Sequence, residues 1–342
     1  MDHAKFVWEA SEAELMAQSL GLPSVLQLLP TLIQPAKNHA RHPISNFHVS
    51  AVGLGSDGRV FLGVNLEFPG LPIHHTVHAE QFLLLNLAAH NCPGLVAFAV
   101  SAAPCGHCRQ FLQELCNSST LQIHITSLHK NPDHDITFKP LSELFPYPFG
   151  PFDLLEDETP LLLEHHNNGL SLVLTKSQKL DTNLDKNNNH GHLCNGSSEN
   201  DSETQSITSN GNMNSENLSN GFREKTEKEN NHVKYAALEA ANDSHAPYSG
   251  CPSGVALMDC DGKVYNGSYV ESAAYNPSLG PVQAALVAFV AMGGGEYERI
   301  VAAALVEKEK AKVRQEDTAR LLLNVICPKC EIKVFHCNVA EN

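Results

Sequence analysis

An internal repeat constrains the fold of this chain more than any other feature of its sequence. Seven residues recur at a constant offset of 204, and the two sets lie on either side of a polar central segment. The first set, Pro43, Ser45, Asp57, Gly58, Val60, Gly63 and Glu67, matches Pro247, Ser249, Asp261, Gly262, Val264, Gly267 and Glu271. Seven identities in one register indicate that one structural unit is built twice.

Both copies follow the same predicted order of elements. A helix leads to a turn that begins at Pro43 or Pro247, then to a β-hairpin closed by Asp-Gly, a second helix and an aliphatic strand. The aliphatic strand covers residues 95–100 in the first copy and 300–305 in the second. Helices that alternate with strands favour an α/β fold, so we predict two repeated domains, each a mixed β-sheet sandwiched by helices.

A change of composition separates the two copies. Residues 176–232 are rich in Asn and carry few aliphatic side chains, too few to offset the entropy lost on ordering the chain. We expect a disordered insertion or linker there, without chemistry of its own. The other predicted boundaries are an N-terminal extension over 1–20, a first domain over 21–175 and a second domain over 233–342, as the chain length of 342 residues allows.

Charge and hydropathy exclude several classes of function. The net charge of −15 repels polyphosphate, so a long nucleic acid is not an expected partner. The longest apolar run, residues 282–292, is about half of the roughly 20 residues that a membrane helix needs. The first 15 residues fit neither a secretory signal nor a transit peptide, so the ten cysteines are expected to be reduced thiols of a cytosolic protein without a membrane partner.

Two short motifs in the first copy predict a metal site. His78-Ala79-Glu80 opens an apolar helical run, and Pro104-Cys105-Gly106-His107-Cys108 follows the aliphatic strand. Cysteines three residues apart share a helical face, and a helix N-terminus favours the thiolate form. Two thiolates and one imidazole suit a tetrahedral Zn²⁺ ion with an open fourth position, which is typical of catalytic sites. We therefore predict that His78, Cys105 and Cys108 bind one Zn²⁺ per chain in the first domain.

The same two motifs also predict a reaction. His-x-Glu followed by Pro-Cys-x-x-Cys is the signature of zinc deaminases that act on nucleobases. Zinc lowers the pKa of bound water from about 15.7 toward about 7, and a carboxylate beside the metal can move protons, so Glu80 is the predicted catalytic residue. Taken alone, Cys-x-x-Cys could also be a redox pair. For the second pair, Cys327 and Cys330, plain reduced thiols are favoured over a structural zinc site.

Four segments of the first copy resemble the cytidine deaminase family, specifically its larger two-domain, homodimeric form. These segments cover residues 44–49, 64–68, 76–81 and 104–111. The resemblance extends over nearly the whole chain except the Asn-rich segment. It implies two cytidine-deaminase-like domains, a homodimer, and hydrolytic deamination of cytidine and 2′-deoxycytidine to uridine and 2′-deoxyuridine, as in pyrimidine salvage.

The resemblance also implies which residues contact the nucleoside. Asn65 and Glu67 are the implied contacts of the ribose 3′-hydroxyl, and Leu66 between them is a further implied substrate-binding residue. Phe47 and Phe149 are implied to line the base pocket, backbone groups of Ala79 and Ala103 to contact the pyrimidine edge, and Ala274 to approach the 5′ side. A carboxylate at the 3′-hydroxyl would face a phosphate in a polynucleotide, which disfavours that substrate. Because no Lys/Arg cluster lies near these motifs to receive a 5′-phosphate, we predict a nucleoside substrate.

The second copy lacks the predicted metal ligands. With a one-residue deletion, residues 77–80 align with 280–283, which contain neither His nor Glu, and the strand alignment places Lys310 and Val313 opposite the two cysteines. We therefore predict that the second domain is catalytically degenerate. Two alternatives to the enzyme prediction stay open: a catalytically weak homologue that binds nucleosides or acts as a scaffold, and a polynucleotide cytidine editor.

Overall fold

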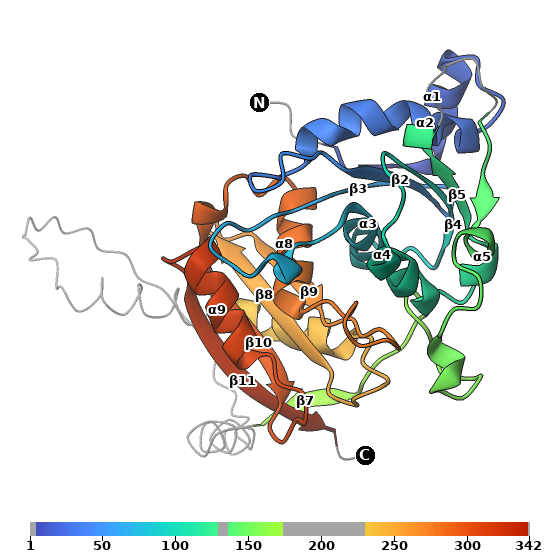
Figure 1. Ribbon diagram of the computed structural model, residues 1–342. Helices are drawn as coiled ribbons and strands as arrows, with labels where there is room; N and C mark the ends of the chain where they lie inside the picture. Colours follow the sequence, from blue (N-terminus) through green and yellow to red (C-terminus); the bar gives the residue numbers. More distant parts are fainter. Residues whose placement is uncertain (1–4, 129–135, 174–229, 341–342) are drawn as a thin grey trace, which may run out of the picture.

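The computed structural model describes residues 5–128, 136–173 and 230–340, which form two sheets with helices on their faces (Figure 1). The first sheet has six strands in the order β1-β3-β2-β4-β5-β6, and the second has five in the order β7-β11-β10-β8-β9. The strands of the first sheet are β1 (Val7–Trp8), β2 (Ser50–Gly55), β3 (Val60–Val64), β4 (Leu95–Val100), β5 (Gln122–Ile125) and β6 (Lys139–Pro140). Those of the second are β7 (Leu170–Leu172), β8 (Ser253–Asp259), β9 (Val264–Ser268), β10 (Ile300–Lys308) and β11 (Glu331–Val339).

The repeat predicted from the sequence is confirmed strand by strand. In both sheets a hairpin pairs antiparallel with a third strand, which pairs parallel with a fourth: β3-β2-β4-β5 in the first sheet and β9-β8-β10-β11 in the second. The hairpins turn at Gly58 and Gly262, whose φ angles of 85° and 81° lie in the left-handed region that favours glycine. Both sheets are mixed, as expected for each domain.

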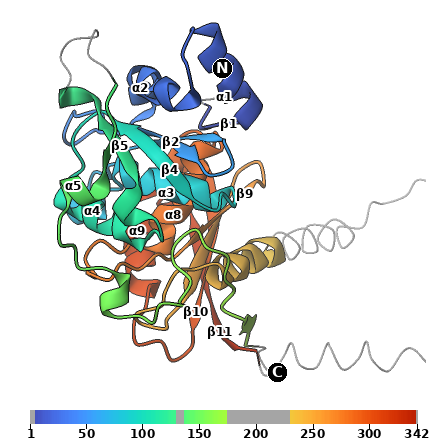
Figure 2. The same cartoon turned by 90° about the vertical axis from the view of Figure 1, so that its right-hand side faces the viewer.

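Helices cover both faces of each sheet. Their bounds are α1 (Ala10–Ser19), α2 (Val25–Ala36), α3 (Ala79–Ala89), α4 (Gly106–Phe111), α5 (Leu141–Leu144), α8 (Pro281–Ala291) and α9 (Glu316–Ile326), and a further helix includes residues 230–242. Helix α2 packs on the outer face of the first sheet. Figure 2 shows the helix through 230–242 on the face of the second sheet opposite α8 and α9, where Val233, Ala237 and Ala241 form a separate core with that sheet.

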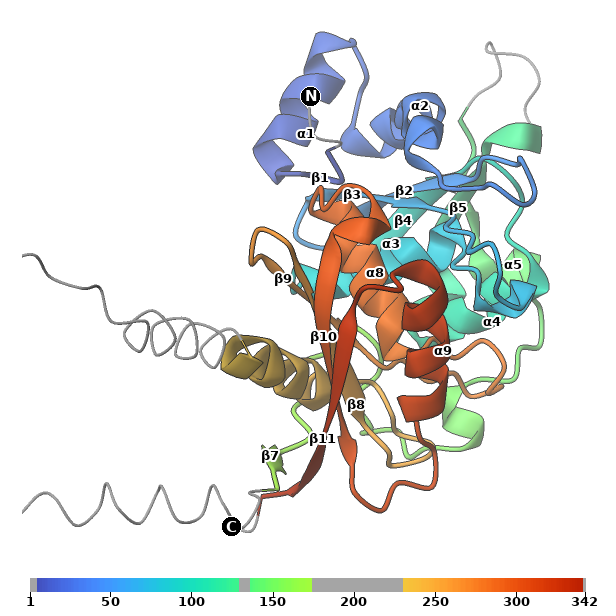
Figure 3. The ribbon, with the colours of Figure 1, turned by 90° about the vertical axis from the view of Figure 1, so that its left-hand side faces the viewer.

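The two domains meet along a pair of apolar helices. Helices α3 and α8 pack against each other between the two sheets, as Figure 3 shows. Nearly every residue of both helices is buried, as expected for helices that are apolar on all sides. This central layer joins the halves of the chain through one continuous hydrophobic core. Within the described residues, none of the helices has the length and apolar character needed to cross a bilayer.

Two repeated glycines are explained by close packing of these helices on the sheets. A Cβ atom at Gly63 of β3 would lie against the Ala79 carbonyl oxygen and 2.6 Å from the Leu83 backbone nitrogen in α3. At the matching Gly267 of β9, a Cβ would lie 2.7 Å from the Cα of Ala285 in α8. Since real Cβ atoms do not approach backbone this closely, both positions require glycine.

The start of α8 corrects the predicted register of the second copy. The offset between the copies falls from 204 to 202 before this helix, so the deletion is two residues and not one. The N-cap of α8 is Gly280, whereas the N-cap of α3 is His78. Gly280 and Val282 therefore occupy the places of His78 and Glu80, and the conclusion that both functional side chains are lost is unchanged.

The predicted places of the cysteines in the second copy were also wrong. Cys105 is the N-cap of α4, and the corresponding N-cap of α9 is Gln315. Gln315 and Thr318 therefore stand opposite the two cysteines, while Lys310 and Val313 lie in the connection before the helix. The prediction failed because the connection between β10 and α9 is longer than the one between β4 and α4, although the strands before it stay in register.

Three predicted segments can be compared with the strand pairing. Residues 7–8, inside the expected extension 1–20, add strand β1 to the edge of β3. Strand β7, inside the range 21–175 expected for the first domain, pairs with β11 of the second sheet. The chain has therefore crossed to the second sheet by residue 170. The Asn-rich segment 176–232 lies outside the described residues except for 230–232, which belong to a helix.

Candidate metal centre and active site

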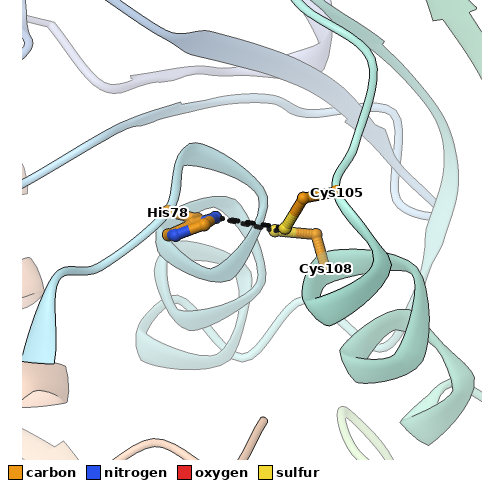
Figure 4. Close-up of side chains that lie close together, drawn as sticks. All are labelled: His78, Cys105 and Cys108. Carbon is orange, nitrogen blue, oxygen red and sulfur yellow. Dashed lines mark hydrogen bonds between the residues drawn. The ribbon is translucent and has the colours of Figure 1, made fainter. Parts of the chain in front are cut away.

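Three predicted ligands converge at the N-termini of two helices (Figure 4). The Nδ1 atom of His78 lies 3.5 Å from the Sγ atom of Cys105 and 3.3 Å from that of Cys108, and the two sulfur atoms are 3.7 Å apart. Among the described residues this is the one group of three or more His, Cys, Asp or Glu side chains close enough to share a metal ion. The three side chains that the sequence predicts as ligands of one metal ion therefore lie together, although they come from two separate helices.

The distances within this cluster fit a tetrahedral zinc ion. Zn–S bonds of about 2.3 Å and Zn–N bonds of about 2.0–2.1 Å hold ligand atoms roughly 3.5–3.8 Å apart in a tetrahedron, close to the separations observed here. Two thiolates and an imidazole leave one coordination position without a protein ligand. Cys108 is buried and Cys105 is exposed, so the cluster is accessible from one side.

Local interactions hold the ligands in place. The backbone N–H of His78 donates to the Oε1 atom of Gln81 at 3.1 Å, which fixes the start of α3. Cys105 caps α4 and Cys108 lies in its first turn. Arg109 donates to the carbonyl oxygens of Pro104 at 2.8 Å and Leu144 at 2.7 Å, which ties α4 to the end of α5.

The cluster favours the ionised form of one thiol even without considering a metal. Hydrogen bonds from Cys108 and His78 lower the pKa of the Cys105 thiol to about 3. Metal-binding cysteines must lose their protons, so an environment that stabilises thiolate favours metal binding.

Glu80 lies beside the metal ligands and is not one of the three. It follows His78 by two residues in α3 and is 5% exposed. Burial raises the pKa of its carboxyl group, and the carboxyl group is close enough to the cluster to interact electrostatically with His78, Cys105 and Cys108. A buried carboxyl group next to a metal site is suited to proton transfer.

Asn65, one of the implied ribose contacts, uses both polar atoms of its side chain in hydrogen bonds to the preceding loop. Its Oδ1 atom accepts a hydrogen bond from the Val49 N–H at 2.9 Å, and its Nδ2 donates to the Phe47 carbonyl oxygen at 3.0 Å. Asn65 therefore shapes the loop that presents the exposed side chain of Phe47.

Glu67 has the same loop as its partner. It accepts hydrogen bonds from the N–H groups of Ile44 at 2.8 Å and Ser45 at 2.9 Å and from the Ser45 hydroxyl at 2.5 Å. Burial opposes ionisation, but these hydrogen bonds outweigh it and hold the pKa of Glu67 below its usual value. Glu271 of the second domain accepts from the N–H groups of the matching residues 248–249. Organising this loop is therefore common to both copies.

The other implied contacts differ in their exposure. The aromatic rings of Phe47 and Phe149 are about half exposed, and the Phe149 carbonyl oxygen accepts a hydrogen bond from Gln110 in α4 at 2.7 Å. Ala103 and Ala274 are exposed on loops, whereas Ala79 is buried at the start of α3.

Leu66, in contrast, presents no free group to a substrate. Its side chain is completely buried in the core, and its backbone N–H and carbonyl groups pair with those of Val77 at 2.9 Å.

Two functional candidates were not identified from the sequence. Gln81 fixes the His78 backbone and also donates to the Pro277 carbonyl oxygen of the second domain at 3.3 Å. Its recurrence as Gln283, at the offset of 202, was an available signal. Glu114, six residues after Cys108, is a completely buried carboxylate whose partners all lie in the second domain. Neither copy of the repeat gives a signal for this residue.

Comparison with known proteins assigns the chain to a family. Two family models, both described as the cytidine and deoxycytidylate deaminase zinc-binding region, match residues 24–123 and 141–320. The chain belongs to the cytidine deaminase family. It is 52% identical to "Cytidine deaminase 1" of Arabidopsis thaliana over 98% of this chain and 99% of that protein. It is 37% identical to "Probable inactive cytidine deaminase 4" of the same plant over 99% and 98%.

Among solved structures, cytidine deaminase from Mycobacterium tuberculosis is 31% identical over 36% of this chain and 97% of that chain, with a TM-score of 0.31. The two family matches confirm the resemblance inferred from the sequence and the prediction of two cytidine-deaminase-like domains. The family is one of zinc-binding hydrolases, and the cluster of His78, Cys105 and Cys108 in the first domain is the site that fits the zinc ion.

Proposed function

We propose that this cytidine deaminase family member hydrolyses cytidine and 2′-deoxycytidine to uridine and 2′-deoxyuridine. The observation that carries the proposal is the cluster of His78, Cys105 and Cys108 with Glu80 beside it. All four side chains lie in the first domain, so this domain is the proposed catalytic one and the second is the proposed degenerate copy. Asn65 and Glu67 would contact the 3′-hydroxyl, which both sugars carry, so both nucleosides are proposed substrates.

Each residue has a distinct role in the proposed reaction. Zinc bound by the three ligands would supply a Lewis acid that makes water nucleophilic at neutral pH. Glu80 would accept a proton from the water that attacks C4 and deliver it to N3 of the pyrimidine ring. It would then take the second proton from the new hydroxyl group on C4 and pass it to the amino group, which leaves as ammonia while the C4 carbonyl forms. Because Glu80 is almost fully buried, it would exchange this proton with substrate more readily than with solvent.

Charge supports a nucleoside rather than a polynucleotide. The ionised form of Glu67 is stabilised by the loop that it organises, and a phosphate on the 3′-oxygen would be repelled by it. The net charge of −15 opposes binding of a long nucleic acid. One relative is described as inactive, but the present chain keeps all three ligands and Glu80, which favours an active enzyme over a scaffold.

Free thiols support a cytosolic role in pyrimidine salvage. All nine cysteines of the described residues are free, and reduced thiols are typical of a reducing compartment. A cytosolic enzyme that deaminates free nucleosides would return them to the uridine pool.

We further propose a homodimer, because large side chains are exposed around the implied substrate contacts. Phe47, Tyr147 and Tyr275 are 57%, 99% and 65% exposed in the single chain. Each of these residues is an implied substrate contact or lies within two residues of one in the sequence, and exposed apolar side chains at a site favour a protein interface. In the proposed dimer, the partner subunit's Ala274 would approach the 5′ side of the nucleoside, as the resemblance implies. Sedimentation of the zinc-loaded protein at twice the mass of one chain would support this assembly, and sedimentation as a monomer would contradict it.

A Glu80→Gln variant tests the proposed reaction. Gln keeps the size of the side chain but cannot carry the proton, so turnover should fall by at least about 100-fold while the zinc content stays at one ion per chain. The measurement is the ultraviolet absorbance change of cytidine and of 2′-deoxycytidine, with zinc determined on the same samples. If the zinc-loaded wild-type protein converts neither nucleoside, the proposed reaction is wrong and the scaffold alternative is favoured.

A further inference from the structure

Glu114 is a buried carboxylate that the proposed reaction does not use. It ends the short 3₁₀ turn Leu112–Glu114, which continues directly from the cysteine-bearing helix α4. Its side chain has no exposed surface. Burying an ionised carboxylate is costly unless hydrogen bonds replace those lost from water, so the partners of Glu114 decide its role.

All hydrogen-bond partners of the Glu114 side chain belong to the second domain. Its Oε2 atom accepts a hydrogen bond from the Tyr248 hydroxyl at 2.6 Å and lies 3.2 Å from the Nε2 atom of His245, which is itself 2% exposed. Its Oε1 atom accepts from the backbone N–H of Ala273 at 2.8 Å. These partners are more than 130 residues away in the sequence. The end of the α4 segment is therefore held by the opposite domain.

The loop that contains Ala273 also contacts both helices that carry metal ligands. His107, between the two cysteines, places its Nε2 atom 3.1 Å from the Asn276 carbonyl oxygen. Gln81, which accepts the His78 N–H, donates to the Pro277 carbonyl oxygen. The loop over residues 271–277 thus contacts α3 near His78, α4 between its cysteines, and the turn that follows α4.

A second contact between the domains provides a reference that does not involve these helices. Arg41, the repeat counterpart of His245, donates to the Gly295 carbonyl oxygen at 2.6 Å, and its guanidinium lies 4.4 Å from the ring centre of Tyr297. The Tyr297 ring also packs on Phe68 of the first domain, with ring centres 6.0 Å apart. The segment around Arg41 in the first domain and the segment around His245 in the second domain therefore each contact the opposite domain. Of these two contacts, only the one made by His245 lies next to a metal-binding helix.

We propose that Glu114 is a positioning residue through which the degenerate second domain holds α4, and with it Cys105 and Cys108, in the geometry that retains zinc. The second domain contributes no ligand, yet it supplies the hydrogen bonds that fix the ligand-bearing helix. Groups hydrogen-bonded directly to metal ligands typically change metal affinity by about 10–100-fold when they are removed, and Glu114, which acts on the ligands through α4, is expected at the lower end of that range. The inference rests on the metal site of the proposed function but does not depend on which nucleoside, if any, is converted.

The test measures zinc release without any nucleoside. Full-length, zinc-loaded protein is mixed with excess chromophoric chelator, and the rate of zinc transfer is followed well below the Tm of each variant. Glu114→Gln removes the charge and turns an NH₂ group toward a donor, so zinc release should accelerate by about 10-fold or more. Tyr248→Phe, which removes one hydroxyl from the partner side, should accelerate release by a smaller factor and keeps the test valid if Glu114→Gln does not fold.

Tyr297→Leu is the matched control. It removes an aromatic ring from the same domain interface, so it should lower the Tm. It should leave the rate of zinc release within about twofold of wild type, because the Tyr297 ring contacts Arg41, Phe68 and Phe289, which lie outside α3 and α4. Release at the wild-type rate in both Glu114→Gln and Tyr248→Phe would overturn the proposal. Equal acceleration in Tyr297→Leu would also overturn it, since interface stability alone would then explain zinc loss. Conversion of cytidine, measured separately, tests the proposed function and not this inference.

Discussion

At the scale of single residues, the two copies of one glutamate separate a structural role from a functional one. Glu67 and Glu271 both accept hydrogen bonds from two backbone N–H groups of the loop before the hairpin. Only the first copy lies in the domain with the metal cluster. One neighbouring residue that differs is Asn65, which is replaced by Tyr269 in the second copy. Loop organisation thus explains why the glutamate persists in a domain without ligands.

Replacing each glutamate by Gln should reveal both roles. Because a buried, ionised acceptor of two or three hydrogen bonds is lost in either variant, each should lower the free energy of unfolding by about 1–3 kcal/mol. Only Glu67→Gln should raise the KM for cytidine, and the increase should shrink with 3′-deoxycytidine, which lacks the hydroxyl that Glu67 would contact. Urea unfolding and steady-state kinetics provide the two readouts. An equal KM in wild type and Glu67→Gln would show that Glu67 is only structural.

The stability contributed by Glu67 should also depend on pH in a defined direction. Its pKa is lowered in the folded protein, so the ionised side chain stabilises the fold above the pKa of the unfolded chain, and this contribution is lost as the pH falls through the folded-state pKa. The difference in unfolding free energy between wild type and Glu67→Gln should therefore be larger at pH 7 than in acid, and it should shrink as the pH falls through the folded-state pKa of Glu67. Urea titrations at several pH values measure it, and a difference that grows on acidification would contradict the assigned sign.

At the scale of secondary structure, close packing of a strand glycine sets the position of the helix that begins after His78. A methyl group at Gly63 would meet backbone atoms of α3 that have no room to move. Gly63→Ala should therefore displace the first turn of α3, lower the free energy of unfolding by about 1–3 kcal/mol or more, and reduce the zinc retained after dialysis against a chelator.

Gly267→Ala makes the same change in the second domain, where the methyl group would meet α8. It should destabilise the protein by a similar amount with a smaller loss of zinc, because α8 carries no metal ligand. Equal zinc loss in the two variants would show that the effect comes from general destabilisation and not from the position of His78.

Elements set by local pattern were predicted well from the sequence, and connections were not. The aliphatic strand over 95–100 and the hairpin turn at Gly58 follow from hydrophobic pattern and turn chemistry, and the structure has both. The start of α9 was misplaced, because repeat identities end before it and give no measure of loop length. Strand β7 spans only Leu170–Leu172, too short for a periodic signal, and it is a strand because β11 offers it an edge.

The metal ligands could be predicted because they lie in short local motifs, whereas the roles of Glu114 and Glu67 could not. His78, Cys105 and Cys108 lie in short motifs whose spacing to a helix start carries the chemistry. Glu114 depends on residues of the other domain, and Glu67 on backbone N–H groups, neither of which a single sequence displays. Tertiary partners of polar groups therefore mark the limit of the prediction.

At the scale of the whole molecule, the two domains share one hydrophobic core, and the described residues contain a single metal cluster. Helices α3 and α8 share one hydrophobic core, and the loop over 271–277 reaches both ligand-bearing helices. A repeated domain that has lost its ligands can persist when the remaining site depends on its surface. The hydrogen bonds that join the loop over 271–277 to α3 and α4 come from residues outside the central insertion, so we expect them to survive when the insertion is shortened.

The ends of the insertion lie beside the same strand. The N–H of Val173 donates to the His336 carbonyl oxygen in β11 at 2.9 Å, and Asn230 accepts from the Lys333 side chain at 3.0 Å. The two contacts are three positions apart along β11, so a linker of about eight residues, which spans roughly 25 Å when extended, can join the ends.

Replacing residues 174–229 by such a Gly/Ser linker should therefore leave the Tm within a few degrees of wild type, the zinc content at one per chain, and kcat/KM for cytidine within about twofold, because a short linker can join the two described ends without moving either domain. Calorimetry, zinc analysis and the cytidine assay would be run beside Glu114→Gln, which removes a contact between the domains and should lose zinc. A shortened protein that unfolds or loses zinc as readily as Glu114→Gln would show that the insertion supports the fold and is not a simple connection.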